Sequence, residues 1–197
     1  MDTWDVRDWR LRVAELYREV RALSAPEQAH RRWIAGRDAL LAGHAASPVP
    51  LGQRDGFRAR VATYDPAYRF VVEVQPAPVH RREVPTPTDG LVPFERIGKV
   101  ELPGLGTLDV WWLDSYGGGI FLPLRDGGAG AVTYGGGRYV LDTVKGADLG
   151  GTGRELVVDL NFSYQPSCAY SSEWVCPLPG SGNRLDAEVA VGELMPS

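Results

Sequence analysis

The chain has 197 residues, enough for one sizeable core but hardly for two full domains of roughly 100–150 residues each. Its 25 acidic residues outnumber 21 basic ones and give a formal net charge of −4, so a strongly basic phosphate-binding surface is excluded and we expect no nucleic-acid partner. No window approaches the ~20 apolar residues that span a bilayer, and the N-terminal residues lack the apolar run of a signal peptide. We therefore expect a cytoplasmic protein with no membrane partner.

Two helices are predicted at the start of the chain. Apolar residues recur at three- and four-residue steps from 6 to 23, which is typical of one face of an amphipathic helix. A second helix is predicted to begin near Pro26, because proline is tolerated in a first turn, and to end around Gly43. Pro48 and Pro50 then break the helical pattern. The sequence thus predicts an N-terminal helical appendage over 1–46 and a β domain over 47–197.

The rest of the chain favours short antiparallel strands. Residues 57–64 and 68–74 alternate in character on either side of a turn at Asp65 and Pro66, which predicts a hairpin. Further strands are predicted at 79–84, 95–102, 106–113, 119–124, 138–143, 156–162 and 185–191. No ten-residue helical pattern separates them, so parallel βαβ winding is disfavoured. The expected fold class is α+β and mainly β: an antiparallel curled sheet, forming a barrel or a sandwich, with two N-terminal helices.

Two residues of the C-terminal third are candidates for catalysis. Asp159 lies opposite the apolar face of the strand predicted at 156–162, and acid–base chemistry would require burial to raise its pKa. If neighbouring strands bring Arg138 close, the two form a site, and a plain surface ion pair is the alternative. Cys168 is a candidate nucleophile if its thiolate is stabilised, with a buried structural thiol or a local disulfide to Cys176 as the alternative.

Seven further residues are candidates for ligand binding: Tyr134, Arg138, Asn161, Tyr164, Tyr170, Asn183 and Glu193. For Glu193 the alternative is a pair with Arg138 or Arg184, and for Asn183 it is a turn-forming amide. The two cysteines and a histidine such as His80 fit no common zinc pattern, so we predict no metal site. The sequence assigns no cofactor.

The segment from about 121 to 193 resembles a bacterial and archaeal family, Domain of Unknown Function family 1684. The resemblance rests on Thr-Tyr-Gly-x-Gly-Arg-Tyr at 133–139, Asp-x-Asn-x-x-Tyr-x-Pro-x-Cys-Ala-Tyr at 159–170, Cys-Pro-Leu-Pro at 176–179, Asn-Arg-Leu at 183–185 and Gly-Glu at 192–193. Arg37-Asp38 near the end of the second predicted helix also resembles the helical entry of shorter members. The resemblance implies a shared architecture and a shared pocket, and it implies no activity.

Three functions are compatible with these residues. The first is an enzyme or small-molecule-binding protein with a pocket at one mouth of the curled sheet, formed by the C-terminal third. The second is a non-catalytic structural or interaction module, in which Tyr164, Tyr170 and Trp174 lock a C-terminal loop over the sheet. The third is a flavin-binding split barrel, by analogy with the strand count and the helical appendage.

Overall fold

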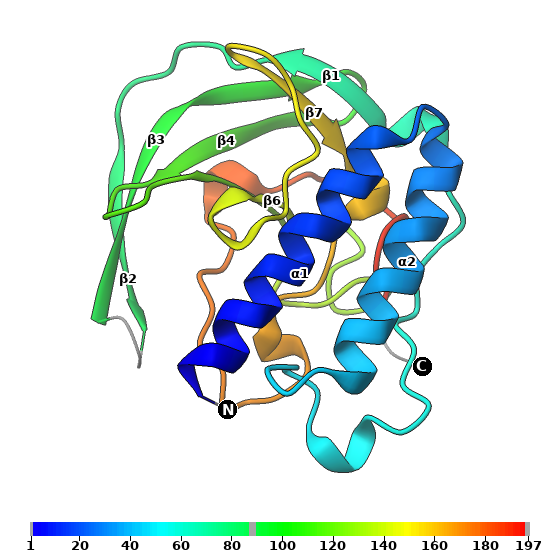
Figure 1. Cartoon of the computed structure of the whole chain (residues 1–197). Helices are drawn as coiled ribbons and strands as arrows, with labels where there is room; N and C mark the ends of the chain where they lie inside the picture. Colours follow the sequence, from blue (N-terminus) through cyan, green and yellow to red (C-terminus); the bar gives the residue numbers. More distant parts are fainter. Residues whose placement is uncertain (1, 87–89, 196–197) are drawn as a thin grey trace.

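The computed structural model describes residues 2–86 and 90–195. Two antiparallel helices, α1 (Thr3–Ala22) and α2 (Pro26–Gly43), lie side by side against the β structure (Figure 1). Asp2 and Asp5 form a capping box that satisfies free amides at the start of α1. Proline opens α2, where its missing N–H costs no helical hydrogen bond. Both predicted helices are confirmed.

Within the described residues, seven strands form two antiparallel sheets. They are β1 (Arg69–Glu73), β2 (Arg81–Thr86), β3 (Gly90–Leu102), β4 (Gly106–Leu113), β5 (Ile120–Leu124), β6 (Arg138–Asp142) and β7 (Glu155–Asp159). One sheet has the order β2-β3-β4-β5-β6, and the other pairs β1 with β7. The mainly β fold class with two helices is confirmed, with an open curled arrangement whose larger sheet ends at β2 and β6.

The two sheets meet at a close backbone contact. Gln75, just after β1, exchanges two backbone hydrogen bonds of 2.8 and 2.9 Å with Lys99 in β3. Glycine at position 98 permits this approach, because a Cβ atom there would lie 2.5 Å from the carbonyl oxygen of Gln75. The contact bends β3, whose pairing with β4 shifts register between Arg96 and Gly98.

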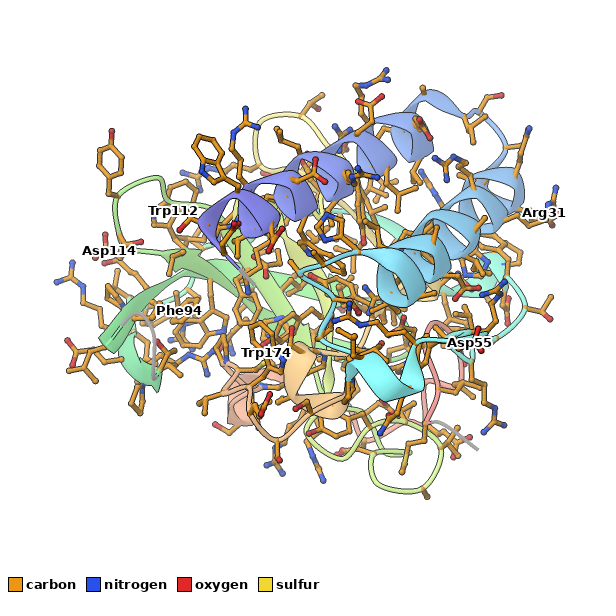
Figure 2. All side chains as sticks on the ribbon, turned by 60° about the horizontal axis from the view of Figure 1, so that its bottom comes forward. Arg31, Asp55, Phe94, Trp112, Asp114 and Trp174 are labelled. Atoms are coloured by element: carbon orange, nitrogen blue, oxygen red, sulfur yellow. The ribbon has the colours of Figure 1, made fainter. Side chains whose placement is uncertain are left out.

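One hydrophobic core joins the helices to both sheets. It includes Leu16 and Trp33 from the helices together with Val158 from β7 and Leu122 from β5. A smaller cluster of Phe94, Trp111, Phe121 and Tyr139 lies beside it. Adjacent indoles of β4 point to opposite faces, since Trp111 is buried and Trp112 is partly exposed. In Figure 2, Trp112 and Asp114 lie at one end of the molecule and Arg31 projects from α2 at the other.

The hairpin predicted from residues 57–64 and 68–74 is wrong. Residues 57–64 join neither sheet and form one isolated bridge, between Val61 and Glu193. The side chain of Asp65 accepts the amide of Ala67 and starts a 3-10 turn instead of a hairpin turn. β1 consequently pairs with β7, where Arg69 lies opposite Asp159, 90 residues further along the chain.

Two other strand predictions need correction. The segment 185–191 joins neither sheet, because side chains and loop amides rather than a strand satisfy its carbonyl groups. The strand predicted at 156–162 ends at Asp159, whose side chain accepts the amide of Asn161 and caps a 3-10 turn over Leu160–Phe162. The prediction that Leu160 and Phe162 face the core is nevertheless confirmed.

Among residues 2–86 and 90–195, no helix is long and apolar enough to cross a membrane.

Candidate functional site

A cavity of about 90 Å³ lies between the helices and the polar loops of the C-terminal third. Its aromatic lining consists of Trp9 and Tyr17 from α1, Trp33 from α2, Tyr139 from β6, and Tyr164 and Tyr170 from the loop after β7. Its polar lining consists of Arg37, Asp142, Lys145, Gln165, Ser167 and Cys176. The site therefore combines residues from both ends of the chain, which meet where α1 and α2 cover β6 (Figure 1).

The polar centre of the cavity wall is an ion pair between Arg37 and Glu193. The guanidinium donates through Nε and Nη2 to the two carboxylate oxygens, with the Nη2 distance at 3.0 Å. Tyr170 Oη at 3.0 Å and the amide of Gln165 at 2.6 Å complete the set of donors to Glu193, whose side chain is fully buried. Burial alone would lower the pKa of Arg37, but the carboxylate outweighs burial and raises it. Arg37 is therefore a permanent cation in this wall.

Glycine at position 192 allows Glu193 to reach this place. Gly192 has a φ of 73°, a left-handed conformation that favours glycine. A Cβ atom there would lie 2.7 Å from the carbonyl oxygen of Ser163 and 2.9 Å from that of Leu160. The following amide, that of Glu193, donates to Ser163 at 2.8 Å. The Gly-Glu pair near the end of the sequence is thus explained by a close backbone approach followed by a buried carboxylate.

Two donor groups at the cavity have no protein partner in the described part of the chain. They are Nη1 of Arg37 and the hydroxyl of Tyr164, which make no hydrogen bond to the described residues. The Oε1 atom of Gln165, which also lines the cavity, is a buried acceptor without a partner among those residues. The two groups belong to one stack, because the guanidinium carbon of Arg37 lies 4.8 Å from the centre of the Tyr164 ring. Burial raises the pKa of Tyr164 well above its usual value, so its hydroxyl stays protonated.

A second ion pair balances the charge of the cavity. Lys145 Nζ lies 3.3 Å from the carboxylate of Asp142 at the end of β6. This neighbouring charge raises the pKa of Lys145. Tyr17 also contributes a polar atom, since its hydroxyl accepts the indole N–H of Trp33 at 3.2 Å. The lining carries two cations, and each one is paired with a carboxylate.

The structure brings only some of the predicted site residues to this cavity. Tyr164 and Tyr170 line it, and Glu193 lies directly behind Arg37. The other candidates, Tyr134, Arg138, Asp159, Asn161, Cys168 and Asn183, are absent from its lining and belong to separate contacts.

Asp159 and Asn161 form one of these contacts, on the side of β7 that faces the chain before β1. Asn161 Nδ2 donates to Asp159 at 2.8 Å, and Tyr64 Oη donates to the other carboxylate oxygen at 3.1 Å. Asn161 also exchanges two hydrogen bonds of 2.8 Å with the backbone of Asp65. Burial raises the pKa of Asp159, against the effect of these donors. The arrangement anchors the segment before β1.

Arg138 does not approach Asp159, because β6 and β7 belong to different sheets. Its fully buried guanidinium pairs instead with Asp126 at 2.9 Å and donates to the carbonyl oxygens of Val189, Val191 and Glu193. The alternative prediction, an ion pair between the Glu193 side chain and Arg138 or Arg184, is also wrong, because Glu193 pairs with Arg37. Arg138 holds the C-terminal segment in place through its backbone.

Asn183 links the C-terminal segment to the larger sheet through hydrogen bonds of its side chain. Its Nδ2 donates to the carbonyl oxygens of Asp109 at 2.8 Å and Pro123 at 3.0 Å, and its Oδ1 accepts the indole N–H of Trp111 at 2.8 Å. All the hydrogen-bonding groups of this buried amide are therefore used, which is the pattern expected of a structural side chain.

Both cysteines are free thiols, and they lie together. The amide of Cys168 donates to Sγ of Cys176 at 3.3 Å. Tyr134 Oη lies 3.4 Å from the carbonyl oxygen and 3.8 Å from Sγ of Cys168. Within residues 2–86 and 90–195, no group of three His, Cys, Asp or Glu side chains is arranged to hold a metal ion.

Sequence reasoning missed Arg37, Tyr17 and Trp33 as cavity residues. A signal was present, because Trp33, Arg37 and Leu41 recur every fourth residue and share one face of α2. An arginine on an otherwise apolar face requires a buried partner, and Glu193 is that partner.

The comparisons agree with this fold. A family described as "Protein of unknown function (DUF1684)" matches residues 57–194. The chain is similar to the solution NMR structure of an uncharacterized protein of Haloarcula marismortui, with a TM-score of 0.58 and 28% sequence identity, over 85% of this chain and 93% of that one. No curated protein matches the sequence. The match over residues 57–194 shows that the chain belongs to the DUF1684 family.

Proposed function

We propose that the protein binds a small organic molecule in the cavity between α1, α2 and β6. The observation that carries this proposal is a cavity of about 90 Å³ lined by aromatic rings, at which Arg37 Nη1 and the Tyr164 hydroxyl make no hydrogen bond to the described residues. Two donors that point at one aromatic-lined cavity without a protein acceptor favour a ligand with an acceptor group.

The cavity limits the size of the ligand. A cavity of roughly 150 Å³ accommodates benzene. The space of about 90 Å³ is smaller, so it suits a short-chain compound or the end of a longer one that extends toward solvent. A flavin ring system does not fit into this space, which argues against the split-barrel analogy.

The chemistry of the wall favours an oxygen acceptor. Arg37 Nη1 and Tyr164 Oη are both donors, and a carboxylate or carbonyl oxygen accepts from such a pair. The aromatic rings around them favour an apolar remainder. Asp159 and Cys168 lie outside this lining, so the proposal assigns them no catalytic role.

The test is a screen of short carboxylic acids and their matched neutral amides by thermal shift. A ligand that binds only the folded state raises the melting temperature. Trp9 and Trp33 line the cavity, so tryptophan fluorescence provides a second readout. Val13 of α1 also lines the cavity, so Val13→Phe fills part of it and should abolish both responses. Responses that survive this substitution would place the ligand elsewhere.

Tyr164→Phe is the sharpest variant, because it removes a hydroxyl that has no protein partner. We expect unchanged stability and an affinity for the ligand about tenfold lower, as for the loss of one hydrogen bond to a charged acceptor. Tyr139→Phe is the matched control, since the Tyr139 hydroxyl donates to the carbonyl oxygen of Pro177 at 2.8 Å. That variant should lose about 1 kcal/mol of stability. Equal effects of the two substitutions on stability would contradict the assignment.

The structural or interaction module remains the second candidate. It is supported by contacts of the loop after Cys176, whose Pro177 and Leu178 carbonyl oxygens accept from Tyr139 and Arg82 at 2.8 and 3.2 Å. A screen without any hit, together with a loss of stability in Tyr164→Phe, would favour this alternative. We propose a cytoplasmic location for either function.

A further inference from the structure

Cys168 and Cys176 lie at a separation suited to a disulfide. The amide nitrogen of Cys168 is 3.3 Å from Sγ of Cys176, which places that sulfur within about 4.8 Å of the Cys168 Cα atom. A disulfide needs about 2.05 Å between the two sulfurs, and a sulfur this close to the Cys168 backbone is within reach of the Cys168 side chain. The 3-10 turn Ser167–Ala169 holds Cys168 in place, and Tyr134 contacts its carbonyl oxygen.

The two thiols differ in access and in charge. Cys176 lines the cavity, and Cys168 does not. The hydrogen bond from the Cys168 thiol lowers the pKa of Cys176 to about 6, and the positive charge of Lys145 acts in the same direction. The same hydrogen bond raises the pKa of Cys168. The surroundings therefore favour the thiolate at Cys176, which faces the cavity, and the protonated thiol at Cys168.

We propose that Cys176 reacts with small hydroperoxides and that Cys168 resolves the product as a disulfide. The Cys176 thiolate attacks one peroxide oxygen, so an S–O bond forms, the O–O bond breaks, and the second oxygen leaves as hydroxide or alkoxide that takes a proton from water. Cys168 then attacks Sγ of Cys176, the S–S bond forms, and the S–O bond breaks with release of water. With hydrogen peroxide, two thiols and one peroxide give one disulfide and two waters, and a cellular dithiol returns the pair to its reduced state.

The proposal is independent of the organic ligand, although both use the same cavity. A small peroxide fits the space of about 90 Å³. Oxidation would draw Cys176 toward Cys168 and so change one wall of the ligand site. The cavity would then respond to the redox state of the cell.

The experiment uses the whole chain and hydrogen peroxide in stoichiometric amount. The chain has only two cysteines, so the loss of both free thiols with one peptide link between Cys168 and Cys176 identifies the product by mass spectrometry. In Cys168→Ser the sulfenic acid at Cys176 should persist and be trapped by a 1,3-dicarbonyl reagent. Cys176→Ser should consume no peroxide above background.

The pH dependence of the oxidation rate distinguishes a reactive site in the folded protein from ordinary thiol oxidation. In the folded chain the rate should rise with a midpoint near pH 6, while the urea-unfolded chain should show a midpoint near 8.5, the value of a free cysteine. Lys145→Gln should move the folded midpoint upward. A folded midpoint near 8.5, or oxidation without a link between the two cysteines, would overturn the proposal.

Discussion

The ion pair between Arg37 and Glu193 gives the sharpest prediction about stability. Glu193→Gln keeps the shape of the side chain but removes its charge, while Arg37 stays a buried cation. Four donor contacts reach this carboxylate, from Nε and Nη2 of Arg37, the Tyr170 hydroxyl and the Gln165 amide. Removing one partner of a buried pair costs about 3–5 kcal/mol, which for a chain of this size lowers the melting temperature by roughly 10 °C.

The assay is thermal and urea unfolding of Glu193→Gln beside Glu188→Gln, an exposed carboxylate on the same segment. The control should stay within about 0.5 kcal/mol of wild type. The double variant Arg37→Gln/Glu193→Gln should lose at least about 1 kcal/mol less than the sum of the single variants, because the two side chains contact each other. A Glu193→Gln loss below about 1 kcal/mol, or strict additivity, would refute the assigned role.

Three other predictions concern the remaining contacts. Gly192→Ala should unfold near or below the melting temperature of Glu193→Gln, because its Cβ atom meets the Ser163 carbonyl oxygen at 2.7 Å, and normal melting would contradict this backbone approach. Arg138→Met should cost about 3–5 kcal/mol in urea unfolding by leaving Asp126 unpaired. Burial raises the pKa of Asp159 above 3.8, so its ionisation destabilises the folded state as the pH rises through that range. As the pH rises from 3.5 to neutral, the stability of Asp159→Asn should therefore increase relative to that of the wild type. The same pH dependence of stability in the two proteins would contradict this role of Asp159.

Elements set by local chemistry were predictable from the sequence. The helices follow from apolar periodicity, and the strand predicted at 106–113 coincides with β4 (Gly106–Leu113). Strand alternation also explains why Trp111 is buried while its neighbour Trp112 is exposed. Each of these features depends on residues a few positions apart, so neighbours alone determine it.

Pairing between distant segments was not predictable. The alternation in 57–64 indicates an extended segment, but the sequence does not say which strand lies beside it, and β1 pairs with β7. The clustering of motifs after residue 133 directed attention to one end of the chain. The cavity instead combines those loops with α1 and α2, through Arg37 and a carboxylate 156 residues away. In the sequence, this contact was indicated only by the position of Arg37 on an otherwise apolar face of α2.

Several predicted site residues have a different role in the structure from the one predicted. The structure buries Asn183 and Arg138, and burial of an amide or a guanidinium is costly. That cost is offset within the protein, by Trp111, Asp126 and backbone carbonyl groups. A sequence motif of polar residues identifies side chains that need partners, and the fold decides whether those partners are protein groups or a ligand.

The most direct measurement is a crystal structure of the protein soaked with the best-binding short carboxylic acid. The account predicts ligand density in the cavity, with an acceptor oxygen within hydrogen-bonding distance of both Arg37 Nη1 and Tyr164 Oη. Ordered water alone in the cavity, with the acid bound on the outer surface, would contradict it.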